Sequence, residues 1–375
     1  MANFHWYLLL VLVIIPILIS SFIYQLDTFD AAPLPNDHDY FSETTISVPK
    51  RHNHVLSVSE RVGEGLLFGP EDLAYDAEKG LLFTGCDDGW IKTVNLRDDD
   101  DDYLKVENWT FVGGRPLGLA LAKDGSLVVA EPYQGLLLVR ERGTVELLTD
   151  SAEGLRFGLT DGVDVTLDGK IYFTDASYKY PLNDHMLDVM EARPHGRLLS
   201  YDPKTNQTLV LAQDLYFANG VALSPDQDAI IFCETLLRQC KKYHIKDEKK
   251  GTIELFIQSL PGFPDNIRYD REGHYWIGLT AGKTRLWDLI FKYPFIRKLL
   301  VVLEKYNVKI PNGMVNGGVL SVDLDGRPVS LYSDKGLYHV TGGLKVGNYL
   351  YQGSLTKPYL NRIDLNKHAA PGKYE

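Results

Sequence analysis

The sequence predicts an all-β fold built from six similar units. A turn or acid/amide residue, an apolar stretch, an Asp-Gly-type turn and a second apolar stretch occur in this order six times. The repeated points, spaced 46, 45, 58, 46 and 76 residues apart, are Pro70, Pro116, Asp161, Asn219, Asp265 and Thr341. A period near ~45 residues with four short strands per unit is typical of a six-bladed β-propeller. We therefore predict this propeller for residues 45–368.

The strands and turns of the units follow in order along the chain. Residues 45–62 alternate in period two and predict extended strands. We expect this terminal segment to complete the last blade, because that closure removes an open sheet edge. In the later repeats, Asp-Gly pairs between apolar runs indicate hairpins. Equivalent points of all blades lie near one axis, so the repeated residues are expected to share one pocket.

Two insertions interrupt the repeats. Residues 178–197 extend the third unit and have helical character, and residues 283–316 extend the fifth, with leucines such as Leu286 and Leu289 at helical spacing. One interpretation of the longer insertion is a helix packed on the propeller, or a lid over the pocket. A second is that it also lies on a membrane surface. Pro294 breaks the helix, which favours the packing or lid role.

The N-terminal segment has a different composition. Residues 6–22 carry no charge and are about as long as the ~20 residues of a membrane-spanning helix. We therefore predict that residues 1–25 are a signal peptide or a signal anchor that contacts the membrane, followed by a linker at residues 26–44. The propeller would then follow the secretory pathway, on the luminal side of the endoplasmic reticulum membrane or in the vacuole lumen.

Three further features bear on location and partners. Asn108 and Asn206 stand in N-x-T glycosylation sequons. Cys233 and Cys240 flank a turn between two predicted strands, so they could face each other in a disulfide, with Cys86 left over. The net charge of −11 argues against nucleic acid as a partner. A small molecule in the axial pocket is the expected partner.

Several long segments resemble a known family. Residues 173–177, 196–202, 217–224 and 261–267 are similar to the strictosidine synthase-like family, and the resemblance extends over about residues 60–365. It implies a six-bladed propeller delivered to the secretory pathway by an N-terminal signal or anchor. More distantly, the chain resembles paraoxonases and gluconolactonases, which share the propeller and carry calcium on its axis.

The resemblance implies a calcium site on the axis. Glu71, Asn219 and Asp265 match oxygen ligands, Asn266 follows them, and Thr160 replaces a further Asn. Calcium prefers such oxygen ligands, although a Thr hydroxyl is a weaker donor. An alternative is that the Asn-Gly and Pro-Asp-Asn sequences only stabilise turns. Turn chemistry alone, however, does not require the acid at Glu71.

Two acidic residues match a second site. In paraoxonases, acids at the positions of Asp72 and Asp161 hold a buried structural calcium. The same resemblance therefore implies a second, structural metal at these two residues.

The catalytic residues of the relatives are not kept. Leu117 stands where paraoxonases have a catalytic His, and Thr341 stands where strictosidine synthase has a catalytic Glu. A base would have to come from Asp265, from Glu71 or from a histidine near the pocket. The residues that we expect to line the substrate pocket are Leu117, Asn266, His339 and Thr341.

These residues favour a calcium-assisted hydrolase of the esterase, lactonase or arylesterase type, acting on a small apolar substrate. Asp265 would be the proton acceptor, with Glu71 as the second catalytic carboxylate. Two alternatives stay open: a Pictet–Spengler-type amine–aldehyde condensation, and a propeller that binds a small ligand without catalysis. Strictosidine synthesis itself is not expected, because Thr341 cannot act as a carboxylate base.

Overall fold

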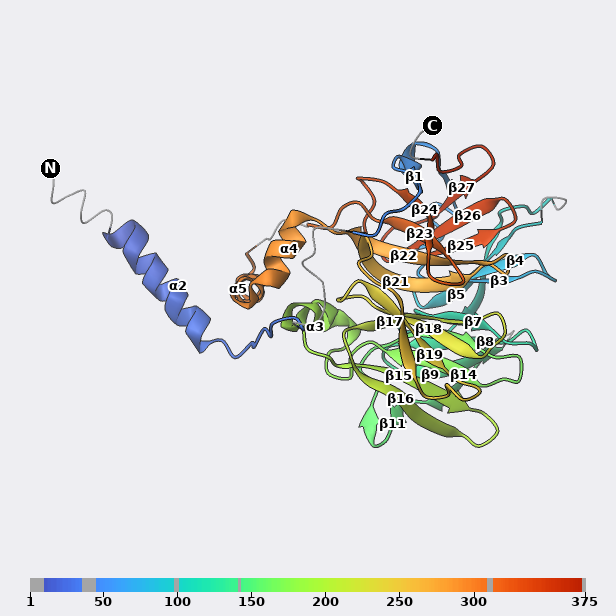
Figure 1. The fold of residues 1–375 in the computed structure, drawn as a ribbon, viewed down its shortest axis with the longest axis horizontal. Coiled ribbons are helices and arrows are strands. Elements are labelled where there is room, and N and C mark those ends of the chain that lie inside the picture. The colour runs from blue at the N-terminus through green and yellow to red at the C-terminus, as the bar shows by residue number, and fades with distance from the viewer. Residues whose placement is uncertain (1–9, 36–44, 98–100, 141–142, 309–312, 373–375) are drawn as a thin grey trace.

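The fold is the six-bladed β-propeller that the repeats predict, seen here in a computed structural model that describes residues 10–35, 45–97, 101–140, 143–308 and 313–372 (Figure 1). Four blades are built from consecutive antiparallel strands. Blade 1 contains β3 (Leu73–Asp76), β4 (Leu81–Gly85), β5 (Trp90–Asn95) and β6 (Val106–Phe111). Blade 2 contains β7 (Leu119–Leu121), β8 (Leu127–Glu131), β9 (Gly135–Arg140) and β10 (Thr144–Thr149). Blade 3 contains β13 (Thr160–Val165), β14 (Ile171–Asp175), β15 (Gly196–Asp202) and β16 (Gln207–Leu215). Blade 4 contains β17 (Ala218–Leu223), β18 (Ala229–Glu234), β19 (Gln239–His244) and β20 (Ile253–Ile257).

The N-terminal strands complete the last two blades. Blade 5 contains β21 (Gly262–Tyr269), β22 (His274–Gly282), β23 (Gly318–Asp323), β24 (Pro328–Ser333) and, parallel to β24, the short β1 (Lys50–His52). Blade 6 contains β25 (Val340–Val346), β26 (Tyr349–Ser354), β27 (Leu360–Asp364) and β2 (Glu60–Val62). Because β2 pairs with β27, with Glu60 opposite Arg362, the predicted closure of the last blade is confirmed.

The inner strands form a closed ring. Each contacts the next, in the order β3, β7, β13, β17, β21, β25 and again β3. Their backbones crowd at the axis: a Cβ atom on Gly162 would lie 2.6 Å from the carbonyl oxygen of Asn219, and one on Gly220 would lie 2.5 Å from that of Asp265. Glycine is therefore required at these two positions, because any side chain would collide with the neighbouring blade.

Apolar contacts between neighbouring blades form the core. Blades 2 and 3, for example, share a buried cluster that includes Val128, Val163 and Phe173. The strands β8 and β18 are buried along their whole length, because each is covered by a blade on both faces. This explains why their sequences are continuous apolar runs rather than alternating patterns.

One part of the predicted N-terminal extended segment is wrong. Residues 55–57 form a short 3-10 helix (Val55–Ser57) between β1 and β2. The backbone N–H groups of Ser57 and Val58 donate to the carbonyl oxygens of His54 and Val55, each at 3.2 Å. The side chain of Val55 is fully buried among residues of blades 5 and 6, so tertiary packing overrides the local alternation.

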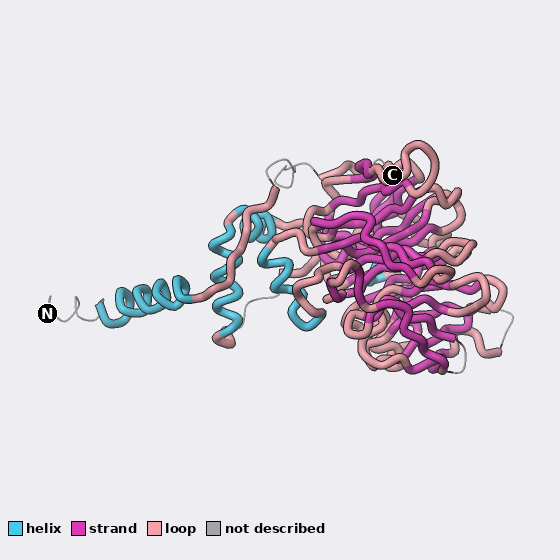
Figure 2. Tube along the Cα trace, turned by 90° about the horizontal axis from the view of Figure 1, so that it is seen from below, coloured by secondary structure: helices cyan, strands magenta, loops and turns pink. Residues whose placement is uncertain are grey.

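Helices gather at one end of the propeller, between the strands and the N-terminal helix (Figures 1 and 2). The N-terminal segment contains a π-helical turn (Leu10–Ile14) and α2 (Ile15–Leu26). The insertion of blade 3 contains a 3-10 turn (Leu182–Asp184) and α3 (His185–Glu191), and that of blade 5 contains α4 (Arg285–Lys292) and α5 (Pro294–Lys305). A small hairpin of β11 (Ser151–Ala152) and β12 (Leu155–Arg156) precedes blade 3.

The predicted membrane anchor at residues 1–25 is described only from Leu10 onward. Over the described ranges, no helix is both long enough and apolar enough to cross a membrane.

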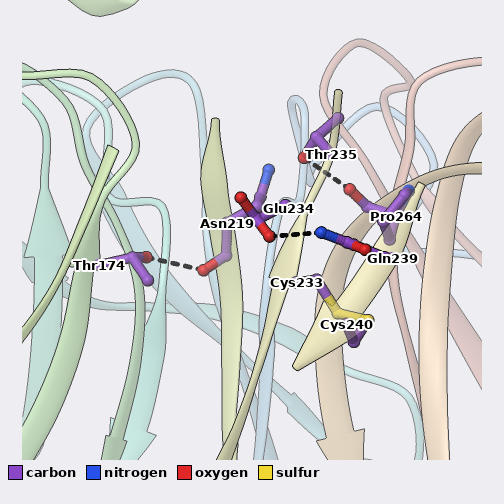
Figure 3. Close-up of a disulfide and its surroundings, with 8 residues drawn as sticks. All are labelled: Thr174, Asn219, Cys233, Glu234, Thr235, Gln239, Cys240 and Pro264. Atoms are coloured by element: carbon purple, nitrogen blue, oxygen red, sulfur yellow. Dashed lines mark hydrogen bonds between the residues drawn. A yellow bond between two sulfur atoms is a disulfide. The ribbon is translucent and has the colours of Figure 1, made fainter. Parts of the chain in front are cut away.

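A disulfide joins the two central strands of blade 4 (Figure 3). Cys233 on β18 lies directly opposite Cys240 on β19, and their Cα atoms are 4.0 Å apart. Both cysteines are fully buried, as is the free Cys86 in blade 1. Asn108 and Asn206, the residues of the two sequons, are exposed, and glycosylation at them stays a prediction.

Candidate functional site

Glu71 and Asn266 meet at the axis from two blades that are separated in the ring by blade 6. Glu71 precedes β3 in blade 1, and Asn266 lies within β21 in blade 5. The side-chain amide of Asn266 donates a hydrogen bond to Oε1 of Glu71 at 2.7 Å. The other oxygen, Oε2, is buried and has no hydrogen-bond partner. Burial, together with the charges of Asp72 and Asp161, raises the pKa of Glu71 well above its usual range.

Asp265 is the second carboxyl of this group. It is buried, and burial followed by the charges of Glu71 and Asp161 raises its pKa well above the usual range. A side-chain hydrogen bond from Asn219, on the neighbouring β17, acts in the opposite direction. Two carboxyls and two amides from blades 1, 4 and 5 are therefore grouped on the axis, as the repeat pattern predicts.

Four buried oxygens on residues that the sequence predicts around the metal have no partner in the structure. They come from four different blades and are Glu71 Oε2, Thr160 Oγ1, Asn219 Oδ1 and Asn266 Oδ1. Buried polar atoms are almost always hydrogen-bonded, so a cluster without partners calls for an explanation. Carboxylate, amide and hydroxyl oxygens together form a donor set that suits a hard cation such as calcium. The residues present therefore fit a calcium ion.

The set is short of carboxylates. Among the described residues, no three His, Cys, Asp or Glu side chains form a group that could hold a metal. The candidate site has two carboxylates, Glu71 and Asp265, and its other oxygens come from Asn and Thr. A metal there would depend on these neutral ligands as much as on charge.

The surroundings of Asp72 and Asp161 do not match the predicted second metal site. Both oxygens of Asp72 already accept hydrogen bonds: Oδ1 from the Leu73 backbone and from Nε of Arg268, and Oδ2 from the Leu119 backbone and from Nη2 of Arg268. Burial and the charge of Asp72 raise the pKa of Asp161 to about 8. The cation beside Asp72 is thus a guanidinium of the protein itself, and these contacts give a second metal no support.

Three of the predicted pocket residues have structural contacts. The hydroxyl of Thr341 donates a 2.6 Å hydrogen bond to the backbone carbonyl of Glu71. Leu117 is buried in the apolar cluster beneath the inserted helices. His339 lies 3.3 Å from the Thr356 hydroxyl through Nδ1, and burial lowers its pKa. None of the three is hydrogen-bonded to Asp265 in the described contacts.

The inserted helices pack on the propeller beside the start of β21, close in sequence to the axial residues of blade 5. Gly282, the last residue before the longer insertion, pairs with Gly262, three residues before Asp265. Trp287 of α4 packs edge-on against Phe263 of β21, with ring centroids 5.4 Å apart. Residues of blades 2, 3 and 4 join the same buried cluster, among them Leu117. The insertion therefore packs on the propeller through an apolar inner face, and its role as a lid stays a prediction.

Comparison with known proteins identifies the family. A sequence model of strictosidine synthase matches residues 161–248, and one of the strictosidine synthase-like N-terminal region matches residues 51–94. Strictosidine synthase-like protein 6 of Arabidopsis thaliana is 50% identical over 362 residues, which cover 96% of each chain. The chain belongs to the strictosidine synthase-like family. The adipocyte plasma membrane-associated protein of Danio rerio is 33% identical, over 84% of this chain and 80% of that protein.

Solved structures share the propeller of this strictosidine synthase-like protein. A gluconolactonase from Xanthomonas campestris aligns over 89% of this chain and 98% of its own, with a TM-score of 0.58 and 17% identity. A calcium-binding regucalcin from Agrobacterium tumefaciens covers 85% of this chain and 95% of its own, with a TM-score of 0.57 and 15% identity. At these identities the similarity establishes the fold alone.

Sequence reasoning missed three polar residues near the axis. Arg268 lies on β21 and contacts Asp72. Arg115 is buried, and its charge lowers the pKa of Glu71. Gln352 is buried, and neither its side-chain oxygen nor its side-chain nitrogen has a hydrogen-bond partner. It lies close to the axis, because a Cβ on the next residue, Gly353, would be 2.2 Å from the carbonyl oxygen of Glu71. A charged residue within a predicted buried strand was the only signal for Arg268.

Proposed function

We propose that this strictosidine synthase-like propeller is a calcium-assisted hydrolase that cleaves an ester or lactone of a small, largely apolar substrate. One observation carries the proposal: on the predicted ligand residues of four blades, four buried oxygens have no hydrogen-bond partner. Turn chemistry would satisfy such atoms within their own loops, whereas a cation would satisfy all of them together.

The residues have separate roles in this proposal. Glu71, Asn219 and Asp265 would hold the ion, with Thr160 and Asn266 assisting. When bound, calcium would supply positive charge that polarises the carbonyl of the substrate. Asp265 would accept a proton from water, as the carboxylate that the axis places beside the ion. The apolar inner face of the lid would hold the substrate and exclude bulk water.

The relatives agree with this proposal at a coarser level. Propellers of the same fold are described as a gluconolactonase and as a calcium-binding protein. A relative described as plasma membrane-associated supports a secretory route for this chain. We accordingly propose that the propeller lies on the luminal side and is tethered through its N-terminal segment.

The contacts of Thr341 count against the condensation alternative. Its hydroxyl is bonded to the Glu71 carbonyl, so blade 6 offers no carboxylate at that point. A condensing enzyme would need a base from elsewhere on the axis.

The test begins with binding of calcium, independent of any substrate. Thermal unfolding of the full chain is measured after chelation and after adding calcium or magnesium. At a calcium concentration 100 times the Kd, binding to the folded state alone would stabilise it by about 2.7 kcal/mol. Asp265→Asn and Glu71→Gln should abolish the calcium response, whereas Asp325→Asn, an exposed turn residue, should retain it.

Turnover is then measured on aryl esters and lactones with and without calcium. Calcium-dependent hydrolysis that is lost in Asp265→Asn is the expected result. If the wild-type protein unfolds at the same temperature with and without calcium, the proposal is wrong. A coupled amine–aldehyde product formed without metal would favour condensation, and stabilisation by a ligand without turnover would favour the binding alternative.

A further inference from the structure

The apolar surface of helix α4 extends beyond the face that packs on the propeller. Trp287, Ile290 and Phe291 are buried against the propeller, as expected for a packed helix. Leu286 and Leu289, three residues apart and beside this buried face, remain 49% and 48% exposed. A helix on a protein surface ordinarily carries polar residues on the face away from the core. Packing on the propeller therefore explains only one face of α4.

The exposed apolar surface continues along α5. Phe295 and Leu299, four residues apart and so on one side of the helix, are 58% and 41% exposed. Two tyrosines, whose rings are apolar and whose hydroxyls are polar, stand at the two ends of α5. The outer face of the lid, as we call this surface, consists of Leu286, Leu289, Tyr293, Phe295, Leu299 and Tyr306. Soluble proteins seldom leave so many large apolar side chains together in water.

The charge of the lid is opposite to that of the whole chain. Residues 283–308 contain six basic and two acidic residues, whereas the full sequence has a net charge of −11. Arg297 and the side chain of Lys283 are buried, so the basic residues at the surface are Arg285, Lys292, Lys298 and Lys305. Basic residues next to an apolar helix face are typical of contact with anionic lipid headgroups. A basic face also suits the acidic surface of a second copy of the propeller. The experiment must therefore separate binding to lipid from binding to a second copy.

The N-terminal helix leaves the protein beside this face. Lys298 and Lys305 of α5 bind Asp27, just after α2: Nζ of Lys298 donates to the backbone carbonyl at 2.7 Å, and Nζ of Lys305 lies 2.6 Å from Oδ2. The ammonium of Lys298 also lies 4.9 Å from the ring centre of Tyr24. Several large apolar side chains of α2 are exposed, for example Leu18 at 63% and Phe22 at 62%. Two exposed apolar surfaces are thus held together at the end of the molecule where the helices gather (Figures 1 and 2).

We propose that the outer face of the lid lies in the headgroup region of a lipid bilayer that contains anionic lipids. The apolar side chains would enter the boundary of the acyl chains, and the lysines would remain among the headgroups. Because α4 packs on Phe263, two residues before Asp265, the end of the propeller that carries these residues would face the membrane. This inference does not depend on the proposed hydrolase activity.

The test places a reporter on the lid of the full chain in vesicles. Leu289→Cys and Phe295→Cys are labelled with an environment-sensitive fluorophore, in vesicles of phosphatidylcholine and phosphatidylserine with brominated acyl chains as quencher. Leu324→Cys is the matched control: Leu324 is 42% exposed in the same blade, in the turn at the opposite end of β23. Leu12→Cys, in the N-terminal segment, reports that the chain has bound. Cys86 is fully buried and should not take the label.

The expected result is quenching at Leu289 and Phe295 that is several-fold stronger than at Leu324. The proposal would be overturned if the label at Leu12 is quenched, which shows that the chain has bound, while the labels at Leu289 and Phe295 are quenched no more than the label at Leu324. Energy transfer between labels on different molecules, without lipid quenching, would show that a second copy covers the face and would also overturn it.

A charge variant distinguishes membrane contact by the outer face of the lid from membrane contact by the N-terminal segment. Leu289→Asp with Phe295→Asp changes only exposed side chains, so the unfolding temperature should stay close to that of the wild type. In this background a label at Leu286→Cys should lose its quenching by brominated lipid, while the label at Leu12 keeps it. Unchanged quenching at Leu286 would contradict the proposed role of the outer face.

Discussion

The guanidinium of Arg268 binds the carboxylate of Asp72 through two nitrogens, and Nε lies 3.0 Å from Oδ1. The same guanidinium donates to the backbone carbonyls of Leu119, Val163 and Val221 at 2.9, 3.2 and 3.2 Å. These acceptors belong to blades 1 to 4, and Arg268 itself belongs to blade 5. One side chain therefore links five of the six blades at the axis.

Replacing Arg268 by Met should destabilise the propeller strongly. The substitution would leave Asp72 as a buried carboxylate without its cation, and breaking a buried pair in this way typically costs about 3–5 kcal/mol. Arg268→Lys should have an intermediate effect, because an ammonium can pair with Asp72 but cannot reach all three carbonyls. The free energy of unfolding, measured with denaturant, gives the comparison.

The matched control is Arg327→Met. Arg327 pairs with Asp325 at 2.6 Å, but both side chains are largely exposed, so its removal should cost less than about 1 kcal/mol. Equal losses for the two substitutions would show that the axial contacts of Arg268 are not important for stability.

The hydroxyl of Thr341 should contribute to stability rather than to chemistry. Thr341→Val would leave the buried Glu71 carbonyl without this donor, which costs about 1–3 kcal/mol. Thr341→Ser keeps the hydroxyl and should lose less. Denaturation of both variants provides the measurement, and a Val variant as stable as the wild type would contradict the assigned contact.

The three cysteines should be distinguishable by their reactivity. Cys233 and Cys240 are joined in a disulfide, and burial raises the pKa of the Cys86 thiol to about 12. At pH 8 that thiol is protonated and inaccessible, so a thiol reagent should find no reactive group in the native protein. It should find one in denaturant and three after denaturation with reductant. Cys86→Ser should lower the last two counts by one, and a thiol that reacts in the native wild type would contradict the burial.

The repeats predicted the fold because each blade is encoded by short-range signals. Apolar runs and Asp-Gly turns define single hairpins, and their period defines the ring. The parallel pairing of β1 with β24 has no such signal, since only three residues of the N-terminal segment take part. Closure by β2 was predictable, because an open last blade would leave an edge exposed.

The same distinction applies to the candidate site, where some contacts have a signal in the sequence and others have none. Glu71, Asn219 and Asp265 recur at equivalent points, so their grouping at the axis could be predicted from spacing. The contact between Arg268 and Asp72 joins residues 196 positions apart, and nothing local to either residue indicates it. It is also the contact that changes the interpretation of Asp72, from a metal ligand to the partner of an internal cation.

Thr160 offers the sharpest test of the calcium proposal. Its hydroxyl is fully buried and unpartnered, at the position where the resemblance to paraoxonases implies an Asn. Thr160→Asn would replace this oxygen by a longer-reaching amide oxygen, and Thr160→Val would remove the oxygen while keeping the shape. If Thr160 is a ligand, calcium affinity should increase in the order Val, Thr, Asn, by about tenfold or 1.4 kcal/mol per step. The affinities follow from the dependence of the unfolding temperature on calcium concentration. Equal calcium responses in all three proteins would exclude Thr160 from the site, while leaving the test of Asp265 and Glu71 unaffected.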